Sequence, residues 1–124
     1  MSLGLQGTLT VLQRLDLTLP EEIIHVAGSN GKGTVCAIMA ASLSMNGRKN
    51  VLFTSPHVAR IEERVRRNGT PISSREFDEA LIRIHHAATG DSNIPHLELT
   101  FFEITYLVAM VASQGCEVLI LETG

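Results

Sequence analysis

The fold follows from residues 23–53, which read IIHVAGSNGKGTVCAIMAASLSMNGRKNVLF. The stretch opens with a short β-branched run, continues through a glycine-dense loop, and passes from Lys32 to Met45 into small and apolar residues that favour a packed helix. Asn46 and Gly47 end this helix, and a second apolar run of strand length follows over 51–55. The order strand, loop, helix, strand predicts a βαβ unit with parallel strands.

The flanking segments contain further helix signals. Leucines at helical spacing precede Pro20, and two capping-box patterns pair Ser73 with Glu76 and Thr100 with Glu103. Three more helices are therefore expected, over 9–17, 74–88 and 101–112. The last of these is apolar nearly all round, as in a helix packed deep against a sheet, and Gly115 is expected at its C′ position.

Two strand signals complete the pattern. Alternating residues flank the Asn68–Gly69 pair, which predicts a tight hairpin because both turn residues need a positive φ. Residues 117–124, EVLILETG, contain the nearly continuous apolar run expected of a strand inside a parallel sheet. The chain is thus predicted to be an α/β protein, with a mostly parallel sheet flanked by helices as in P-loop NTPases.

Composition narrows the class of protein. The 124 residues suit one domain or part of one, and 44% hydrophobic with 19% charged residues is the balance of a soluble globular chain. A net charge of −3 offers no global basic field for nucleic acid or lipid, and no apolar run approaches the length of a membrane span. Cys36 and Cys116 lack metal or disulfide spacing, so a cytoplasmic protein with reduced thiols is expected.

The glycine loop predicts a phosphate site. Gly28, Gly31, Lys32 and Thr34 stand between a strand and a helix, where backbone N–H groups and the helix N-terminus attract anions. The spacing is G-x-x-G-K-G-T, and the common G-x-x-x-x-G-K-[ST] pattern is not met, because Val26 stands where its first glycine belongs. The alternative is a glycine-rich turn with a solvated lysine.

Two strand ends offer ligands for a metal that would accompany the phosphates. Glu122 follows four apolar residues at the end of its strand, a position from which P-loop proteins reach Mg²⁺. Ser55 stands at the matching end of the 51–55 run, so its hydroxyl could face the same ion. The alternatives are an ordinary carboxylate at a strand end and a turn serine before Pro56.

Four segments carry a resemblance to a known family: HVAGSNGKGT (25–34), FTSPHVARIEERVRRNG (53–69), LTFFEITYLVAM (99–110) and VLILETG (118–124). Together they resemble the folylpolyglutamate synthase and dihydrofolate synthase family, within the Mur ligase superfamily. The resemblance extends over about residues 3–124. It implies that 1–124 form part of an N-terminal ATP-binding domain, the Mur-ligase central domain, and that a C-terminal glutamate-ligase domain lies outside this chain.

The resemblance also implies roles for particular residues. Lys32 is the catalytic cation, and the ATP phosphates fall to Ser29, Asn30, Gly31, Lys32, Gly33 and Thr34. The Mg²⁺ ligands are Ser55 and Glu122. Contacts to the pterin are implied for Gly4, Leu5, Thr100 and Phe101. Two positions depart from the family pattern, since Ser29 replaces a threonine and Thr123 a valine, and both replacements are small.

The implied reaction is ATP-dependent amide formation through an acyl phosphate. Its partners are ATP with Mg²⁺, a folate or dihydropteroate, and L-glutamate, with no nucleic acid or membrane; the complete protein is expected to be a monomer and this piece alone inactive. Three alternatives stay open: another Mur-type amino-acid ligase, a nucleotide-binding or kinase module, and a binding protein without enzymatic activity. Whether the acceptor is dihydropteroate, folylpolyglutamate or both does not follow from the sequence.

Two groups of residues receive plainer interpretations. A mixed-charge cluster is interpreted as a solvated face, although the resemblance places some of it near the substrate entrance; its members are Arg60, Glu63, Arg64, Arg66 and Arg67. Phe101 and Phe102 are predicted to be core residues because the helix around them is apolar throughout.

Overall fold

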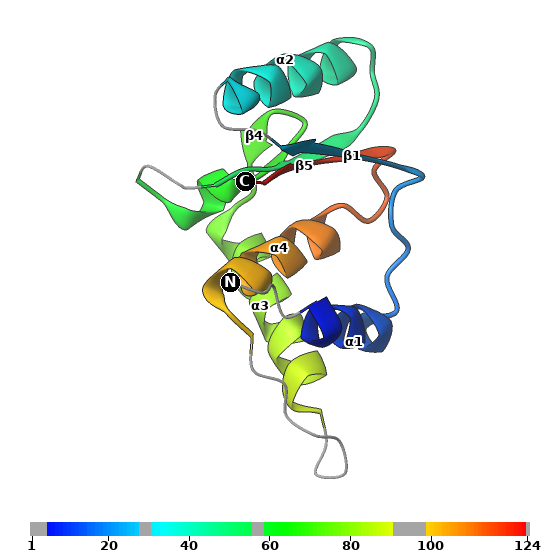
Figure 1. Ribbon diagram of the computed structural model, residues 1–124, viewed down its shortest axis with the longest axis vertical. Coiled ribbons are helices and arrows are strands. Elements are labelled where there is room, and N and C mark those ends of the chain that lie inside the picture. Colours follow the sequence, from blue (N-terminus) through cyan, green and yellow to red (C-terminus); the bar gives the residue numbers. More distant parts are fainter. Residues whose placement is uncertain (1–4, 28–30, 56–58, 91–98, 124) are drawn as a thin grey trace.

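The computed structural model describes residues 5–27, 31–55, 59–90 and 99–123. Its helices are α1 (Leu5–Leu15), α2 (Lys32–Met45), the short 3-10 turn η1 (Ile61–Arg64), α3 (Ser74–Thr89) and α4 (Phe101–Ala112). Its strands are β1 (Glu22–Ala27), β2 (Asn50–Phe53), β3 (Val65–Arg67), β4 (Thr70–Pro71) and β5 (Val118–Thr123). The sheet separates α2 on one face from α1, α3 and α4 on the other (Figure 1).

The sheet has the order β1-β5-β2-β3-β4. The strand β5 lies between β1 and β2 and runs parallel to both, whereas β3 and β4 add an antiparallel hairpin beyond β2. The predicted α/β architecture with parallel strands is therefore confirmed. In the register, Ala27 pairs with Thr123 and Phe53 with Leu121, so β1, β5 and β2 all end at the same edge of the sheet.

Strand residues alternate between two apolar cores. Val51, Phe53, Leu119 and Leu121 belong to the larger core beneath α1, α3 and α4. Their neighbours in sequence point the other way, and Leu52, Val118 and Ile120 pack with Cys36 and Ala40 of α2. Because side chains alternate along a strand, the next residue of β5 on the α2 face is Glu122.

The helices follow their sequence signals closely. The bounds of α2 match the prediction, and the Ser73 and Thr100 hydroxyls accept hydrogen bonds from the third residues of α3 and α4. Two details differ. The helix α1 spans 5–15 where 9–17 was expected, and it ends before Asp16, which has a φ of 52°. Gly115 has the left-handed φ of 81°, but α4 is capped two residues earlier. None of the described helices is long and apolar enough to cross a membrane.

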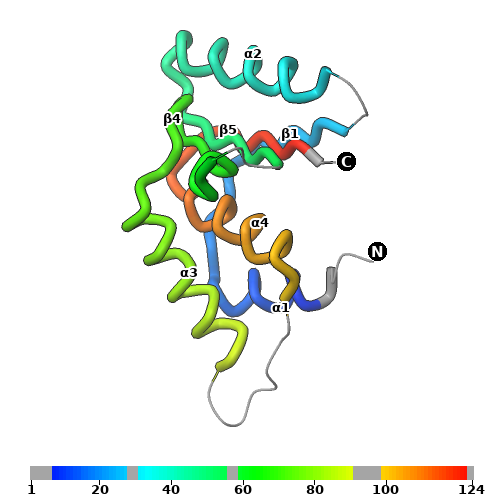
Figure 2. The backbone as a smooth tube through the Cα atoms, turned by 90° about the vertical axis from the view of Figure 1, so that its left-hand side faces the viewer, coloured from blue at the N-terminus to red at the C-terminus, as the bar shows by residue number. Residues whose placement is uncertain are grey.

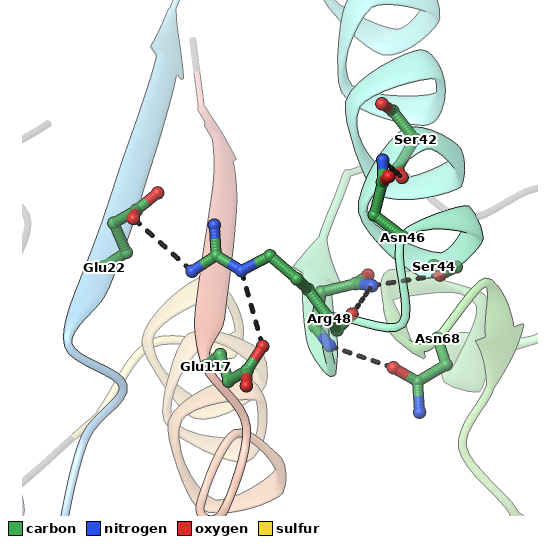
Figure 3. Close-up of polar contacts among 8 residues, drawn as sticks. Glu22, Ser42, Ser44, Asn46, Arg48, Asn68 and Glu117 are labelled. Carbon is green, nitrogen blue, oxygen red and sulfur yellow. Dashed lines mark hydrogen bonds and ion pairs between the residues drawn. The ribbon is translucent and has the colours of Figure 1, made fainter.

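Polar side chains tie the amino-terminal ends of the strands together (Figure 3). The Arg48 guanidinium lies between two carboxylates, 3.5 Å from Glu22 and 3.4 Å from Glu117. The predicted hairpin turn contributes here as well, because Asn68 has the expected positive φ of 51° and its Oδ1 accepts a hydrogen bond of 2.9 Å from the Asn50 N–H. Ion pairs and turn hydrogen bonds thus stabilise the edge of the sheet where the parallel strands begin, which is opposite to the edge near Glu122 and Ser55.

On the face of the sheet covered by α3 and α4, the side chain of Arg67 links β3 to both of these helices. Arg67 donates from both terminal nitrogens to the Glu76 carboxylate of α3 and also to the Ala112 carbonyl of α4, at 2.8 Å. The hydrogen bond to Glu76 raises the pKa of Arg67 above its ordinary value. Because both side chains are about one-third exposed, solvent screens part of the attraction.

A double-mutant cycle with Arg67→Met and Glu76→Gln is expected to give a coupling free energy of about 1 kcal/mol, the upper end for pairs near the surface. Urea unfolding followed by circular dichroism would measure it. The matched control is the pair of Arg75 and Glu79, whose side chains are 89% and 62% exposed and which should show almost no coupling. Equal coupling in the two cycles would contradict the prediction.

Candidate active site

The amino-terminal end of α2 contains the described part of the predicted phosphate loop. Gly31 stands at the N-cap with a φ of 77°, which favours glycine, and its carbonyl accepts the Val35 N–H at 3.0 Å. Gly31 has no side chain with which to cap the first turn, and helix N-termini of this kind commonly bind anions through their early N–H groups. The predicted phosphate residues Lys32, Gly33 and Thr34 form this turn. Gly28, Ser29 and Asn30 lie outside the described residues.

Glu122 lies beside this turn. Glu122 is only 6% exposed, and its carboxylate makes no hydrogen bond or ion pair within the described ranges. Its Oε2 would be 3.9 Å from a Cβ added to Gly33, so the carboxylate and the start of α2 are in close proximity. A buried charge without a partner is unfavourable in a folded protein unless a counter-ion or ligand compensates it. The position therefore suits a ligand for a cation.

The charge of Glu122 extends to its neighbour Cys36. The pKa of the buried Cys36 thiol is raised, chiefly by burial and then by the Glu122 carboxylate, while the Lys32 ammonium acts in the opposite direction. Cys36 is thus a buried neutral thiol between two charged groups of the site. This agrees with its predicted structural role.

A cavity of about 490 Å³ joins the predicted residues of the two strand ends and of the loop. Gly33, Ser55 and Glu122 all line it, together with Thr54 and Arg66. In the described part of the chain no three His, Cys, Asp or Glu residues gather as a metal-binding group. One carboxylate and one hydroxyl nevertheless suit Mg²⁺, which commonly takes one or two carboxylates and completes its shell with phosphate oxygens and water.

A second set of predicted residues meets at the first turn of α4. Thr100 and Glu103 form the predicted capping box, with a 3.0 Å hydrogen bond from the Thr100 N–H to Glu103 Oε1. Glu103 also accepts a 3.0 Å hydrogen bond from the Thr8 hydroxyl of α1. This buried contact joins the starts of α1 and α4, and spacing gave no signal for it because the two residues are 95 positions apart. Leu5 begins α1, and Gly4 lies outside the described residues.

The aromatic prediction was right for Phe102 and wrong for Phe101. Phe102 packs against the core, edge to face with Phe53 at 5.6 Å between ring centroids. Phe101 is 53% exposed, and the Arg64 guanidinium lies 5.0 Å from its ring centroid. Phe101 is the first residue of α4 and lies at the edge of the core, so the apolar sequence that follows it does not ensure that its ring is buried. The exposed ring of Phe101 and the guanidinium of Arg64 form a surface on which a planar ligand can stack.

The solvated face predicted for 60–67 is only partly correct. Arg60 is exposed, as expected, and it pairs with Glu62. Arg66 and Arg67 are half-buried, and because they are neighbours in β3 they lie on opposite faces of the sheet. The sequence signal that could have separated them is the period of two along a strand, which the hairpin prediction already contained.

Figure 2 shows how the two sets of residues are placed. The first turn of α2 and the carboxyl end of β5 lie on the same side of the molecule as the first turns of α1 and α4. The first turn of α2 and the end of β5 border the face of the sheet that α2 covers. The first turns of α1 and α4 border the opposite face. Both therefore gather at the edge where the parallel strands end, which is the usual ligand edge of an open α/β sheet.

The left-handed glycine at the start of α2 and the buried carboxylate near the end of β5 place the candidate site of this α/β domain at the carboxyl ends of its parallel strands. No protein-family model matches the chain. An Escherichia coli protein named dihydrofolate synthase/folylpolyglutamate synthase is 34% identical over 127 aligned residues, covering 100% of this chain and 29% of that protein. The chain belongs to the folylpolyglutamate synthase and dihydrofolate synthase family.

Solved structures agree with this assignment. A bifunctional folylpolyglutamate synthase/dihydrofolate synthase with Mn, AMPPNP and L-glutamate bound superposes with a TM-score of 0.87 at 36% identity, over 100% of this chain and 30% of that one. The E. coli FolC complex with DHPP and ADP gives a TM-score of 0.86 at 34% identity, over 100% and 29%. The chain thus spans less than one-third of the length of these relatives.

Proposed function

We propose that the full-length protein carrying this chain is an ATP-dependent ligase that joins L-glutamate to a folate or dihydropteroate acceptor. The observation that carries the proposal is Glu122, a buried carboxylate without a partner among the described residues, which shares one cavity with Gly33 and Ser55. Relatives with these activities in their names, and related structures holding AMPPNP with L-glutamate or DHPP with ADP, support the choice of substrates.

The proposed reaction has two steps. An oxygen of the acceptor carboxylate attacks the γ-phosphorus of ATP, the bond to the bridging oxygen breaks, and ADP leaves an acyl phosphate behind. The amine nitrogen of glutamate then attacks the acyl carbon, inorganic phosphate departs with the bonding electrons, and loss of a proton gives the amide. Such chemistry depends on positioning and charge stabilisation more than on a covalent nucleophile.

Residues of this chain would meet those needs in three places. The N–H groups of the first turn of α2 would bind phosphate oxygens, and Lys32 would add a positive charge there. Ser55 and Glu122 would hold Mg²⁺, which supplies neutralisation of phosphate charge when bound. Thr100 and Phe101 at the start of α4 would contact the pterin. Leu5 at the start of α1 and the preceding Gly4 would contact it as well.

The proposal includes location and assembly. The protein would act in the cytoplasm, where ATP and glutamate are supplied, and as a monomer. Neither nucleic acid nor a membrane is required, in keeping with the net charge of −3.

The test is ADP release by the full-length protein with Mg-ATP and L-glutamate, comparing dihydropteroate, tetrahydrofolate and a UDP-linked muramyl acceptor. Stimulation by a pteridine acceptor is expected and would show which folate activity is present. Lys32→Ala should abolish the release, whereas Lys49→Ala, an exposed lysine next to the opposite end of β2, should leave it unchanged. Stimulation by the muramyl acceptor alone, or by no acceptor, would refute the folate assignment.

A further inference from the structure

The hairpin strand β3 presents two consecutive arginines to opposite faces of the sheet. Arg67 pairs with Val51 in the register and meets Glu76 on the side of α3 and α4. Arg66 pairs with Leu52, which packs on the side of α2. The Glu76 carboxylate therefore compensates the charge of Arg67, whereas Arg66 lies on the other face of the sheet.

Arg66 lines the same cavity as Gly33, Ser55 and Glu122. It is half-buried, yet in the part of the chain that the structure describes it makes no hydrogen bond, ion pair or cation–π contact. Glu122 shares the cavity but does not pair with it. Two opposite charges thus line one cavity without compensating each other.

We propose that Arg66 binds an oxyanion of the reacting molecules in this cavity. The inference rests on the function proposed above. Once Glu122 holds a cation, the guanidinium of Arg66 gives the cavity an excess of positive charge that an anionic ligand would balance. A guanidinium offers a planar pair of N–H donors that suits phosphate and carboxylate oxygens, and these bonds are stronger than neutral ones.

Two sources could supply the oxyanion. One is a phosphate oxygen of the nucleotide, because Gly33 of the phosphate turn borders the cavity. The other is the acceptor carboxylate, which has to reach the γ-phosphorus. The chemistry recognised is the same, and binding measurements separate the sources.

The experiment replaces Arg66 by methionine in the full-length protein, with Arg75→Met as the matched control. Arg75 has an 89% exposed side chain, and its ion pair is with Glu79 of its own helix. Calorimetry with AMPPNP and Mg²⁺ gives the nucleotide affinity, and steady-state kinetics give KM for the pteridine acceptor. Loss of a charge-assisted hydrogen bond is expected to weaken one of the two by about 10- to 100-fold.

The outcomes are distinct. A weaker AMPPNP affinity identifies a nucleotide phosphate, and a raised acceptor KM with unchanged AMPPNP binding identifies the carboxylate. Arg66→Lys, which keeps the charge and loses the planar fork, should recover part of the loss and serves if the methionine variant does not fold. Both quantities remaining within experimental error of the Arg75 variant would overturn the proposal.

Failure of the proposed function gives a different result. If the wild-type protein joins glutamate to no acceptor but binds AMPPNP, the folate ligase assignment falls while the nucleotide measurement still tests Arg66. AMPPNP affinity that is unchanged in Arg66→Met would then overturn the role of Arg66 as well, since no other oxyanion of the reaction would remain.

Discussion

Glu122→Gln is expected to raise the Mg²⁺ concentration needed for half-maximal ADP release by about 100-fold, at least as much as loss of a residue that only supports a metal ligand. The physical reason is the burial of this carboxylate beside the first turn of α2, without a partner in the described residues. Glutamine keeps the volume and removes the negative charge, so the effect should arise from the metal. A metal titration of activity measures it, and calorimetry with Mn²⁺ and AMPPNP provides a reading independent of turnover.

The matched control for this change is Glu117→Gln. Glu117 precedes the other end of β5, where its side chain is 55% exposed and pairs with Arg48 (Figure 3). Its removal should leave the metal titration as it is in the wild type. If both variants titrate like the wild type, Glu122 does not bind the metal. If both shift equally, the effect comes from the strand and not from the site.

Phe53→Ala is expected to lower the free energy of unfolding by about 3–5 kcal/mol, the usual cost of removing a buried aromatic ring. Phe53 is fully buried in β2 and meets two rings of α4 edge to face, Phe102 at 5.6 Å and Tyr106 at 5.8 Å between centroids. The substitution removes apolar burial and both aromatic contacts, and it leaves a cavity under the central strands. Urea unfolding followed by circular dichroism measures the change.

Phe101→Ala is the comparison for this prediction. It removes the same side chain from the first residue of α4, where 53% of the residue is exposed and Arg64 is its cationic neighbour. The loss of stability should be much smaller than for Phe53, because less apolar surface returns to water. Equal losses for the two variants would contradict the assignment of Phe53 to the core and of Phe101 to the surface.

Local signals predicted much of this fold. The bounds of α2, the Asn68–Gly69 turn and both capping-box helices depend on interactions within a few residues, and such interactions can be read from spacing. The position of β5 between β1 and β2 could not be predicted in this way. Strand order is decided by which apolar faces pack together across the whole chain, and the βαβ pattern of 23–53 is compatible with adjacent or separated strands.

In the candidate site, too, some residues could be predicted from local sequence and others depend on contacts between distant parts of the chain. Glu122 and Ser55 could be found because strand ends are visible in the sequence, and the parallel register brings both to one cavity. The period of two along a strand places Arg66 and Arg67 on opposite faces, but which face of β3 meets α2 depends on the packing of the whole chain, so the sequence did not single out Arg66. The contact from Thr8 to Glu103 was equally hidden, because it joins two helices far apart in the chain.

The central place of β5 has a consequence for synthesis. A ribosome delivers β1 and β2 long before β5, so the nascent chain carries two strands whose facing edges have no partner until residues 118–123 emerge. Those edges present unpaired N–H and C=O groups beside apolar side chains, the combination that promotes aggregation. Closure of these two edges therefore depends on residues 118–123, and a chaperone that shields residues 22–53 until then would increase the yield of folded protein.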